Sequence, residues 1–252
     1  NSSRRPGPIR SGTVAPTNDS SSAREKPTNP IVRLCHTSTM VNEHWPLFDL
    51  EIRTPTLTLR YLDDELIAEL LDVARRGVHD PAVMPFRIPW TDLPSPQMEQ
   101  EAMRFYARTR AEVRPAAWNL QFAVIVDGEV VGACDLMAES FPELRQFTTG
   151  SWLGREFQGR GLGKEFRQAA LALGFEGLGA EFALTAMWHD NAASKGVTTA
   201  LGYELEGRRR ALRRGVADEM LGFRMARTHW ETIRRDDIEL VGVDRAREFL
   251  GI

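Results

Sequence analysis

The feature that most constrains this chain is a glycine-rich hexapeptide, Gln158-Gly159-Arg160-Gly161-Leu162-Gly163. It lies between an apolar, strand-like run and a long amphipathic helical pattern. The three glycines allow the backbone to approach a ligand without interference from Cβ atoms, and free N–H groups converge where the following helix begins. The sequence therefore predicts a turn that binds an anion.

Two familiar phosphate-binding loops do not match this turn. A P-loop has Ser or Thr after its Gly-Lys pair, but Glu165 follows Gly163-Lys164 here, so the hydroxyl that would hold Mg²⁺ is missing. A dinucleotide-binding fingerprint needs a third glycine three residues after the second, where this chain has Phe166. A nucleotide-dependent enzyme is therefore disfavoured.

The loop does match the pattern Q/R-x-x-G-x-G/A through Gln158, Gly161 and Gly163. Its neighbours at residues 150–154, 189–194 and 201–203 match as well. On these motifs the chain resembles the GNAT superfamily of acyl-CoA N-acyltransferases, most closely the ribosomal-protein N-terminal acetyltransferase (RimJ/RimL-like) branch. The resemblance covers roughly Thr54 to Arg227. A purely structural glycine turn would leave the downstream motifs unexplained.

Composition indicates an ordinary globular protein with enough apolar residues, 42% of 252, for a substantial core. Residues 40–252 contain 26 Lys and Arg against 33 Asp and Glu, a net charge of −7 that argues against a nucleic-acid partner. With only Cys35 and Cys134, a disulfide framework is not expected and a reducing, cytoplasmic setting is the default. We also expect no membrane association, because no apolar run is long enough to span a bilayer.

Three regions are predicted along the chain. Residues 1–40 are rich in Ser, Thr, Pro and Asn and are expected to be a flexible extension, with a partner-binding arm as the alternative and Met40 as a candidate natural start. Residues 41–228 are expected to form the acyltransferase domain. Residues 229–252 are expected to be an extension, in helical form, that packs on the domain or on a partner subunit, which leaves a homodimer open.

Periodicity and turn signals give the element order β-α-α-β-β-β-α-β-α-β-β, which agrees with the GNAT fold. The resemblance implies an α/β architecture with a mixed, mostly antiparallel twisted sheet, flanked by helices and splayed between its central strands. Strands are predicted at residues 57–61, 120–126, 129–137, 148–153, 181–187, 203–213 and 216–227, and helices at 63–77, 97–113, 164–177 and 191–200.

The resemblance also implies the cosubstrate site. Acetyl-CoA, or another acyl-CoA such as succinyl-CoA, would bind with its pyrophosphate on the loop at the helix N-terminus and its pantetheine arm between the splayed strands; no metal is implied. The expected cofactor-binding residues are Leu153, Gln158, Gly159, Arg160, Gly161, Leu162, Gly163, Lys164, Asn191 and Ser194. For Asn191 and Ser194, capping of the next helix is the alternative.

Three residues are expected to take part in catalysis. The Leu153 N–H is the expected donor to the thioester oxygen, and Ser194 matches a small polar position close to CoA. Thr198 stands where many superfamily members have a Tyr that protonates the leaving thiolate; a hydrogen bond to its own helix is the alternative. The general base stays open among Asp135, Glu139 and His189.

The expected function is transfer of an acetyl or succinyl group to a primary amine by direct attack in a ternary complex. The amine would be a small molecule or a protein N-terminus, and the alternative is a noncatalytic acyl-CoA sensor. Met84, Phe86 and Trp90 lie where the superfamily has part of its acceptor site, but could equally fill the core. The arginines at 208–210, 213 and 214 either form a solvated hairpin or select an anionic partner.

Overall fold

The computed structural model describes residues 42–252, which lie within one compact unit running from Met40 to Ile252. The predictions of a flexible extension and of a natural start at Met40 concern residues outside this described part. Within it, no helix has the length and apolar character needed to cross a membrane.

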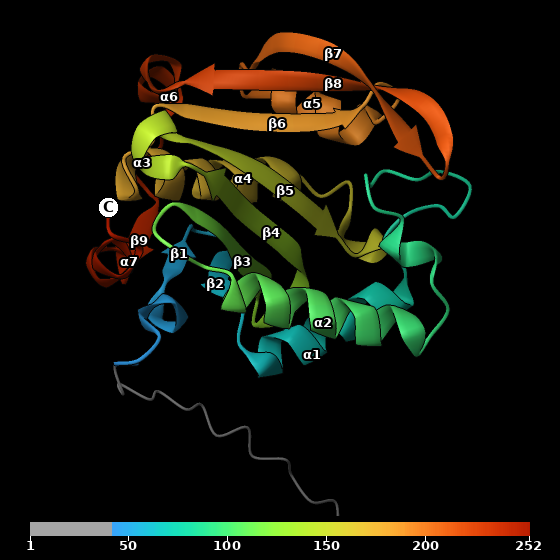
Figure 1. Ribbon diagram of the computed structural model, residues 1–252, viewed down its shortest axis with the longest axis horizontal. Coiled ribbons are helices and arrows are strands. Elements are labelled where there is room, and N and C mark those ends of the chain that lie inside the picture. The colour runs from blue at the N-terminus through green and yellow to red at the C-terminus, as the bar shows by residue number, and fades with distance from the viewer. Residues whose placement is uncertain (1–41) are drawn as a thin grey trace, which may run out of the picture. The chain divides into compact units, whose positions relative to one another are not determined.

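A nine-stranded sheet forms the centre of the unit (Figure 1). Its order is β7-β8-β6-β5-β4-β3-β2-β1-β9, and all neighbours are antiparallel except β5 and β6. This mixed, mostly antiparallel sheet with flanking helices confirms the predicted fold class. The strands are β1 (Glu51–Arg53), β2 (Thr58–Tyr61), β3 (Ala117–Val126), β4 (Glu129–Glu139), β5 (Gln146–Leu153), β6 (Phe182–Trp188), β7 (Glu204–Arg213), β8 (Val216–Ala226) and β9 (Glu239–Val241).

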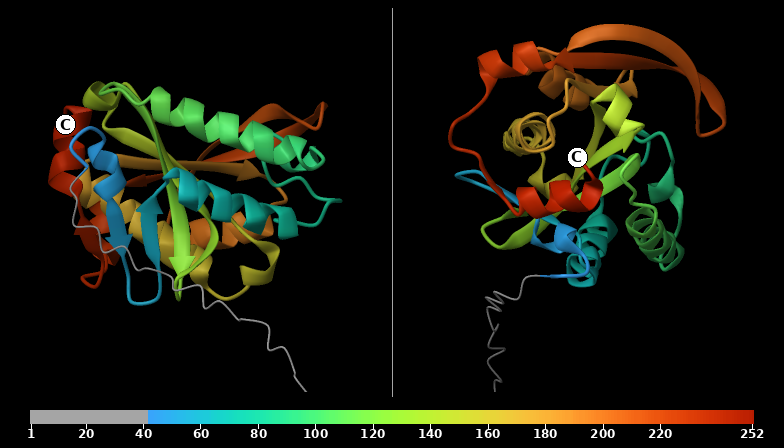
Figure 2. Two further views of the ribbon diagram at one scale, coloured as in Figure 1. Left: turned by 90° about the horizontal axis from the view of Figure 1, so that it is seen from below. Right: turned by 60° about the vertical axis from the view of Figure 1, so that its left-hand side comes forward.

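Helices cover both faces of the sheet. Helices α1 and α2 lie on one face, and α4 and α5 lie on the other (Figures 1 and 2). A π-helical turn, Leu173–Gly177, continues α4, and a 3-10 turn, Trp90–Asp92, precedes α2. The helices are α1 (Asp64–Arg76), α2 (Gln97–Ala111), α3 (Phe141–Leu144), α4 (Leu162–Ala172), α5 (Ala192–Ala200), α6 (Arg227–Ile233) and α7 (Val243–Leu250).

The first long helix illustrates how local sequence sets these elements. The Asp63 carboxylate accepts a hydrogen bond from the Leu66 N–H at 2.8 Å, which caps the N-terminus of α1. Acidic residues fill the first turn and arginines the last, as the helix dipole favours, and Gly77 follows the end. The apolar residues that repeat at helical spacing are buried against the sheet: Leu66, Ile67, Leu70, Leu71 and Val73.

The structure adds elements that the sequence analysis did not predict. Strands β1 and β9 pair with each other at one edge of the sheet, with Ile52 opposite Leu240. The C-terminal region is therefore not only helical: β9 extends the sheet, and α7 packs there through its fully buried Leu250. The helix predicted at 164–177 begins earlier, at Leu162, and changes to π-helical geometry for its last turn.

The π-helical turn lies against the sheet at a point that only glycine allows. A Cβ atom on Gly174 would stand 2.1 Å from the ring of Phe147, which is 1% exposed. We expect Gly174→Ala to lower the free energy of unfolding by about 1–3 kcal/mol because the packed ring cannot move away. The melting temperature, measured by calorimetry, should fall by roughly 2–4 °C per kcal/mol.

Gly196→Ala is the matched control for this prediction. Gly196 is also a helical glycine, in α5, but nothing lies within 4 Å of the position its Cβ would take. Alanine should therefore stabilise this helix slightly. Equal melting temperatures for the two variants would contradict the packing argument.

Candidate active site

The site begins where β5 and β6 separate. These parallel strands pair only from Gln146 to Thr148 on β5 and from Phe182 to Leu184 on β6. Strand β5 continues to Leu153 and β6 to Trp188, so the second half of each strand has no partner across this gap. The splay predicted for the central strands is confirmed, and it leaves backbone groups of β5 facing an opening in the sheet.

Leu153 is the last residue of β5, and the pairing with β4 fixes which way its backbone points. The N–H of the next residue, Gly154, donates to the Val131 carbonyl at 2.9 Å, so Leu153 itself is in a non-hydrogen-bonded pair with Gly132. The Leu153 N–H and carbonyl therefore point away from β4, toward the gap. The carbonyl accepts a hydrogen bond from Gln158 Nε2 at 2.9 Å.

The glycine loop follows directly. Gly159 and Gly161 have φ angles of +76° and +82°, and Gly161 is the residue before α4. Among the described residues, no backbone acceptor bonds the N–H groups of residues 159–163. Gln158 also donates to the Val78 carbonyl at 2.6 Å, so its side chain holds the loop in place. The result is a set of unpaired donors at a helix N-terminus, an arrangement that suits a phosphate group.

Two basic side chains accompany the loop. Arg160 donates to the Glu156 carbonyl at 2.7 Å, and its guanidinium carbon lies 5.5 Å from the Phe157 ring centroid. Lys164, in the first turn of α4, is exposed. Both therefore add positive charge near the donors of the loop.

Helix α5 places the three polar residues expected near the pantetheine arm. The Asn191 side chain caps the helix by accepting a hydrogen bond from the Ser194 N–H at 3.1 Å, and both residues are half-buried. Thr198 is fully buried, and its hydroxyl has no hydrogen-bond partner among the described residues. The alternative for Thr198, a hydrogen bond from its hydroxyl to its own helix, is therefore not present in the structure.

A buried cation that the sequence analysis missed lies between the separated strands. Arg167 of α4 is 5% exposed; its guanidinium donates to Thr185 of β6 at 3.3 Å and to Ser151 of β5 at 3.4 Å. The Tyr203 and Thr149 hydroxyls are buried without a partner, and burial raises the pKa of the Tyr203 phenol. The sequence did carry a signal for this buried cation, because Arg167 lies on the otherwise apolar side of the helix predicted at residues 164–177.

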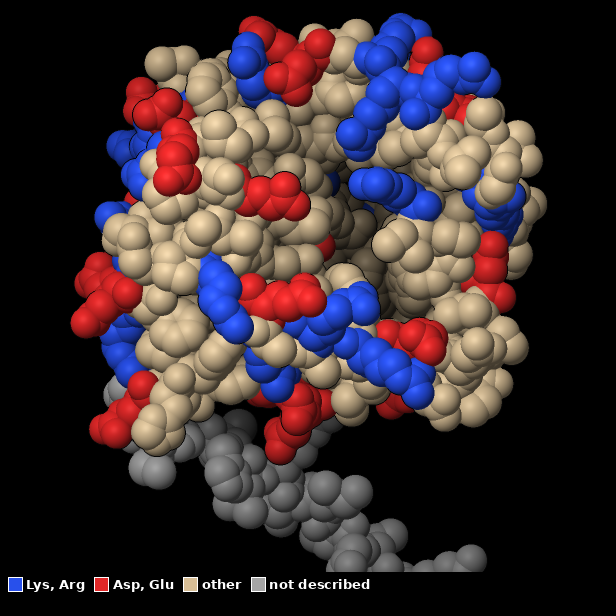
Figure 3. Space-filling view, viewed as in Figure 1, with Lys and Arg blue, Asp and Glu red and all other residues tan. Residues whose placement is uncertain are grey.

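The opposite face of the sheet carries a cavity of about 560 Å³. The face is hollowed near its centre in Figure 3. The cavity is bounded by α1, α2, the loop before α2, and strands β3 to β5. Its walls are mostly apolar, and Gly150, Ser151 and Trp152 at the end of β5 belong to them. The cavity therefore reaches the same strand segment that borders the gap.

Asp135 of β4 lines this cavity; the residue is partly buried, and its Oδ1 atom is shielded from solvent. One carboxylate oxygen accepts a 3.4 Å hydrogen bond from Gln121, and the other, Oδ1, has no partner among the described residues. Burial raises the pKa of this carboxyl, and the nearby hydrogen bonds and the Arg167 charge offset that rise only in part. Burial, and then the Asp135 charge, also raises the pKa of the Tyr106 phenol.

The other acid-base candidates lie elsewhere. Glu139 ends β4 and is exposed. The His189 ring is 48% exposed and lies 3.2 Å from an Asp218 oxygen. Cys134 is fully buried, and burial raises the pKa of its thiol to about 12, so the side chain is a neutral thiol at physiological pH.

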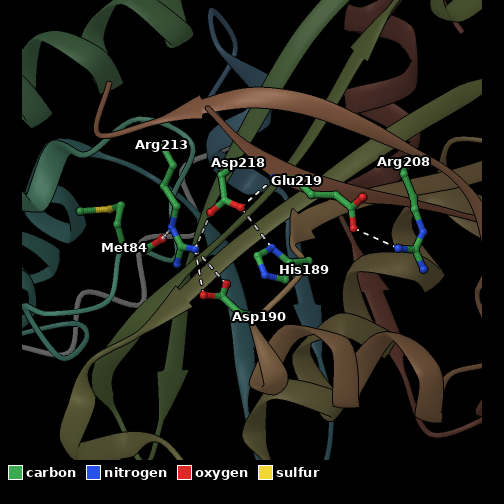
Figure 4. Close-up of polar contacts among 7 residues, drawn as sticks. All are labelled: Met84, His189, Asp190, Arg208, Arg213, Asp218 and Glu219. Atoms are coloured by element: carbon green, nitrogen blue, oxygen red, sulfur yellow. Dashed lines mark hydrogen bonds and ion pairs between the residues drawn. The ribbon is translucent and has the colours of Figure 1, made fainter. Parts of the chain in front are cut away.

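The arginines at the end of β7 are largely engaged by carboxylates. Arg213 donates to Asp190 at 2.9 Å, to Asp218 at 3.0 Å and to the Met84 carbonyl at 2.8 Å (Figure 4). Its hydrogen bond lowers the pKa of the Asp218 carboxyl. Arg214 binds both oxygens of Asp92, at 2.6 and 2.8 Å. These two arginines fasten the hairpin of β7 and β8 to the loop that walls the cavity.

Comparison with known proteins agrees with this architecture. Residues 56–204 match the model of the acetyltransferase (GNAT) domain. A GCN5-related N-acetyltransferase from Brucella melitensis is similar in structure, with a TM-score of 0.59 at 20% identity over 73% of this chain and 81% of that one. The ribosomal-protein-S5-alanine acetyltransferase from Vibrio fischeri gives 0.58 at 16% identity, over 72% and 99%.

RimL, a ribosomal alpha-N-protein acetyltransferase in complex with coenzyme A, gives a TM-score of 0.54 at 16% identity, over 69% of this chain and 95% of that one. At these identities the solved structures establish a shared fold. The match to the domain model covers more than half of the sequence and includes the divergent strands, the glycine loop and the capped helix α5. The chain therefore belongs to the GNAT acetyltransferase family.

Proposed function

We propose that this protein transfers an acetyl group from acetyl-CoA to a primary amine by direct attack. The main support for the proposal is that two different surfaces, a loop with free N–H groups and a cavity, adjoin the end of β5. Free backbone N–H donors follow Leu153 on one side, and a cavity with a carboxylate whose Oδ1 is buried and unpaired adjoins Gly150 to Trp152 on the other. The similarity to ribosomal-protein acetyltransferases supports placing the chain in the RimJ/RimL-like branch.

Different residues bind different parts of acetyl-CoA in the proposed reaction. The N–H groups of residues 159–163 and the dipole of α4 bind the pyrophosphate, with Arg160 and Lys164 adding positive charge. Asn191 and Ser194 lie along the pantetheine arm. Bound acetyl-CoA supplies the acyl group: the amine nitrogen bonds to the carbonyl carbon, the C–S bond breaks, and coenzyme A leaves as a thiol.

Proton transfers and charge stabilisation come from the protein. Asp135 accepts a proton from the incoming ammonium, for which a carboxyl with a raised pKa is well matched. The Leu153 N–H donates to the carbonyl oxygen as it gains negative charge. The Thr198 hydroxyl donates a proton to the leaving sulfur and regains one from the acylated nitrogen, which loses its second proton as the C–S bond breaks. Acetyl is preferred over succinyl because Arg213 and Arg214 already bind carboxylates of the protein.

The first experiment tests the glycine loop. Gly161 has φ +82°, a conformation that valine rarely adopts, although no atom lies within 4 Å of the position of a Cβ. We expect Gly161→Val to remove the thermal stabilisation by CoA while far-ultraviolet circular dichroism stays unchanged. Gly215→Val is the control, because Gly215 has φ +80° and the same free space but lies in the β7–β8 turn. Equal loss of CoA binding in both variants would remove the loop from the site.

The second experiment tests Asp135. We expect Asp135→Asn to lower kcat with acetyl-CoA and an amine by roughly 10²-fold or more, because general-base help is lost. Glu139→Gln, at the exposed end of the same strand, should retain wild-type kcat. The wild-type rate should fall as pH drops through a pKa above that of an ordinary Asp, and this acid limb should be absent from the residual rate of Asp135→Asn.

Thermal unfolding gives an independent readout of the same variant. Because burial raises the pKa of Asp135 in the folded state, folding stability declines as pH rises from the unfolded pKa through the folded pKa. Asp135→Asn should therefore match the wild type in strong acid and melt at a higher temperature at neutral pH. A variant that is less stable than the wild type at neutral pH would contradict the unpaired, buried carboxylate.

The third experiment tests Thr198. Because this buried hydroxyl has no partner, Thr198→Val should leave the melting temperature unchanged or raise it. If the hydroxyl protonates the thiolate, kcat should fall roughly 10²-fold with little change in CoA affinity. Ser194→Ala, which changes a hydroxyl near the start of α5, should alter CoA affinity more than kcat. Normal turnover by Thr198→Val would assign the proton to another donor.

A further inference from the structure

The residues that line the cavity beside β5 indicate which chemical class of acceptor the cavity can bind. Three aromatic side chains from two distant segments form one wall: the Phe86 and Trp90 ring centroids are 5.3 Å apart, and those of Trp90 and Trp152 are 5.6 Å apart. All three line the cavity, together with Ile88 and Leu93. The wall is therefore a continuous aromatic surface.

This surface is held in position by the other half of the chain. Trp188 of β6 donates to the Phe86 carbonyl at 3.1 Å, and Arg213 donates to the carbonyl of Met84, two residues earlier. Arg214 binds Asp92, two residues after Trp90. The loop that carries Phe86 and Trp90 is thus fixed before any ligand arrives, which reduces the entropy lost on binding.

Only one of the charged side chains that line the cavity has a buried oxygen atom without a partner among the described residues. Three charged residues line it, and two of them, Glu101 and Arg108, are exposed on α2. The third is Asp135, whose Oδ1 has no partner among the described residues and whose Oδ2 accepts a 3.4 Å hydrogen bond from the neutral amide of Gln121. A buried carboxylate oxygen without a hydrogen-bond partner is costly, and an ammonium group from a ligand would supply that partner.

From these observations we infer that the acceptor is a small primary amine bearing an aromatic or similarly bulky apolar group. Its ammonium pairs with Asp135, and its ring packs on Phe86, Trp90 and Trp152. This inference rests on the proposed acetyl transfer and narrows its substrate class.

A polypeptide N-terminus fits the same cavity less well. Each residue of a peptide brings an N–H and a carbonyl that need partners when they leave water. The lining offers few uncharged side chains that can accept from peptide N–H groups, namely Gln121, Ser151 and Tyr106, and Trp90 and Trp152 can only donate. An apolar amine, in contrast, needs one polar partner, and its ring gains from burial against aromatic walls. A volume of about 560 Å³ also lies in the range of small-molecule sites.

The test compares acceptors that all have a primary amine and differ in the group attached to it. With acetyl-CoA in excess, thiol release is measured with 2-phenylethylamine, butylamine and a tripeptide that has a free N-terminal alanine. We expect kcat/KM for 2-phenylethylamine to exceed that for butylamine by roughly 10- to 100-fold, the effect of burying a ring. The peptide should be the poorest acceptor, and a peptide that reacts faster than 2-phenylethylamine would overturn the inference.

Binding measurements separate the ring contact from the charge contact. Calorimetric titration with 2-phenylethylamine and its neutral analogue 2-phenylethanol requires no turnover. Trp90→Ala should weaken both ligands, whereas Asp135→Asn should weaken the amine at least tenfold and leave the alcohol unaffected. Glu101→Gln, a change of an exposed lining carboxylate, should alter neither. Loss of amine affinity in Glu101→Gln but not in Asp135→Asn would also overturn the inference.

The outcomes distinguish this inference from the proposed function. Thioester turnover that depends on Gly161 but favours the peptide leaves acetyl transfer standing and refutes the aromatic acceptor. Amine binding that follows the expected variant pattern, with no thiol release from any acceptor, supports the recognition site and refutes acetyl transfer in favour of a CoA-binding sensor.

Discussion

The short parallel pairing between β5 and β6 is the constraint on which the rest of the site depends. After Thr148 and Leu184 the backbones no longer bond each other, and side chains take over part of that connection. Arg167 reaches Ser151 on one strand and Thr185 on the other, so it bridges the strands while keeping them apart. A buried guanidinium costs desolvation energy, which its hydrogen bonds and the charge of Asp135 offset in part. The opening between β5 and β6 is thus maintained by specific side-chain contacts.

The two faces of the sheet at this opening have opposite electrostatic character. On the side of α4, backbone N–H groups and Arg167 favour negative charge, as a phosphate-bearing thioester requires. On the side of α1 and α2, the Asp135 carboxylate favours positive charge, as an ammonium requires. Leu153, at the end of β5, is the residue whose free N–H lies between them. In the proposed reaction, this separation keeps the thioester and the amine on different faces of the sheet until the reacting atoms meet.

Features set by local sequence could be predicted, and features set by distant contacts could not. The loop at Gly161 and the cap at Asn191 follow from spacing along a few residues, and both are where the sequence placed them. The pairing of β1 with β9 joins segments almost 190 positions apart, and strands of three residues have no recognisable alternation. Asp135 was one of three candidate bases left open, because only tertiary structure shows which side chain lies in a cavity. Arg167 was overlooked because helical periodicity predicts burial of apolar residues, not of a cation.

The arginines of the β7–β8 hairpin show how a pattern of charge can mislead until its partners are known. In sequence, Arg213 and Arg214 suggest a surface that attracts anions, but in the structure Asp190, Asp218 and Asp92 already bind them. Their ion pairs are partly exposed, so each contributes little to the stability of the whole fold. Their effect is local: they fix the loop that carries Phe86 and Trp90. The hairpin therefore acts on the proposed acceptor cavity through its shape rather than through charge, and the residues that shape this cavity are spread over both halves of the chain.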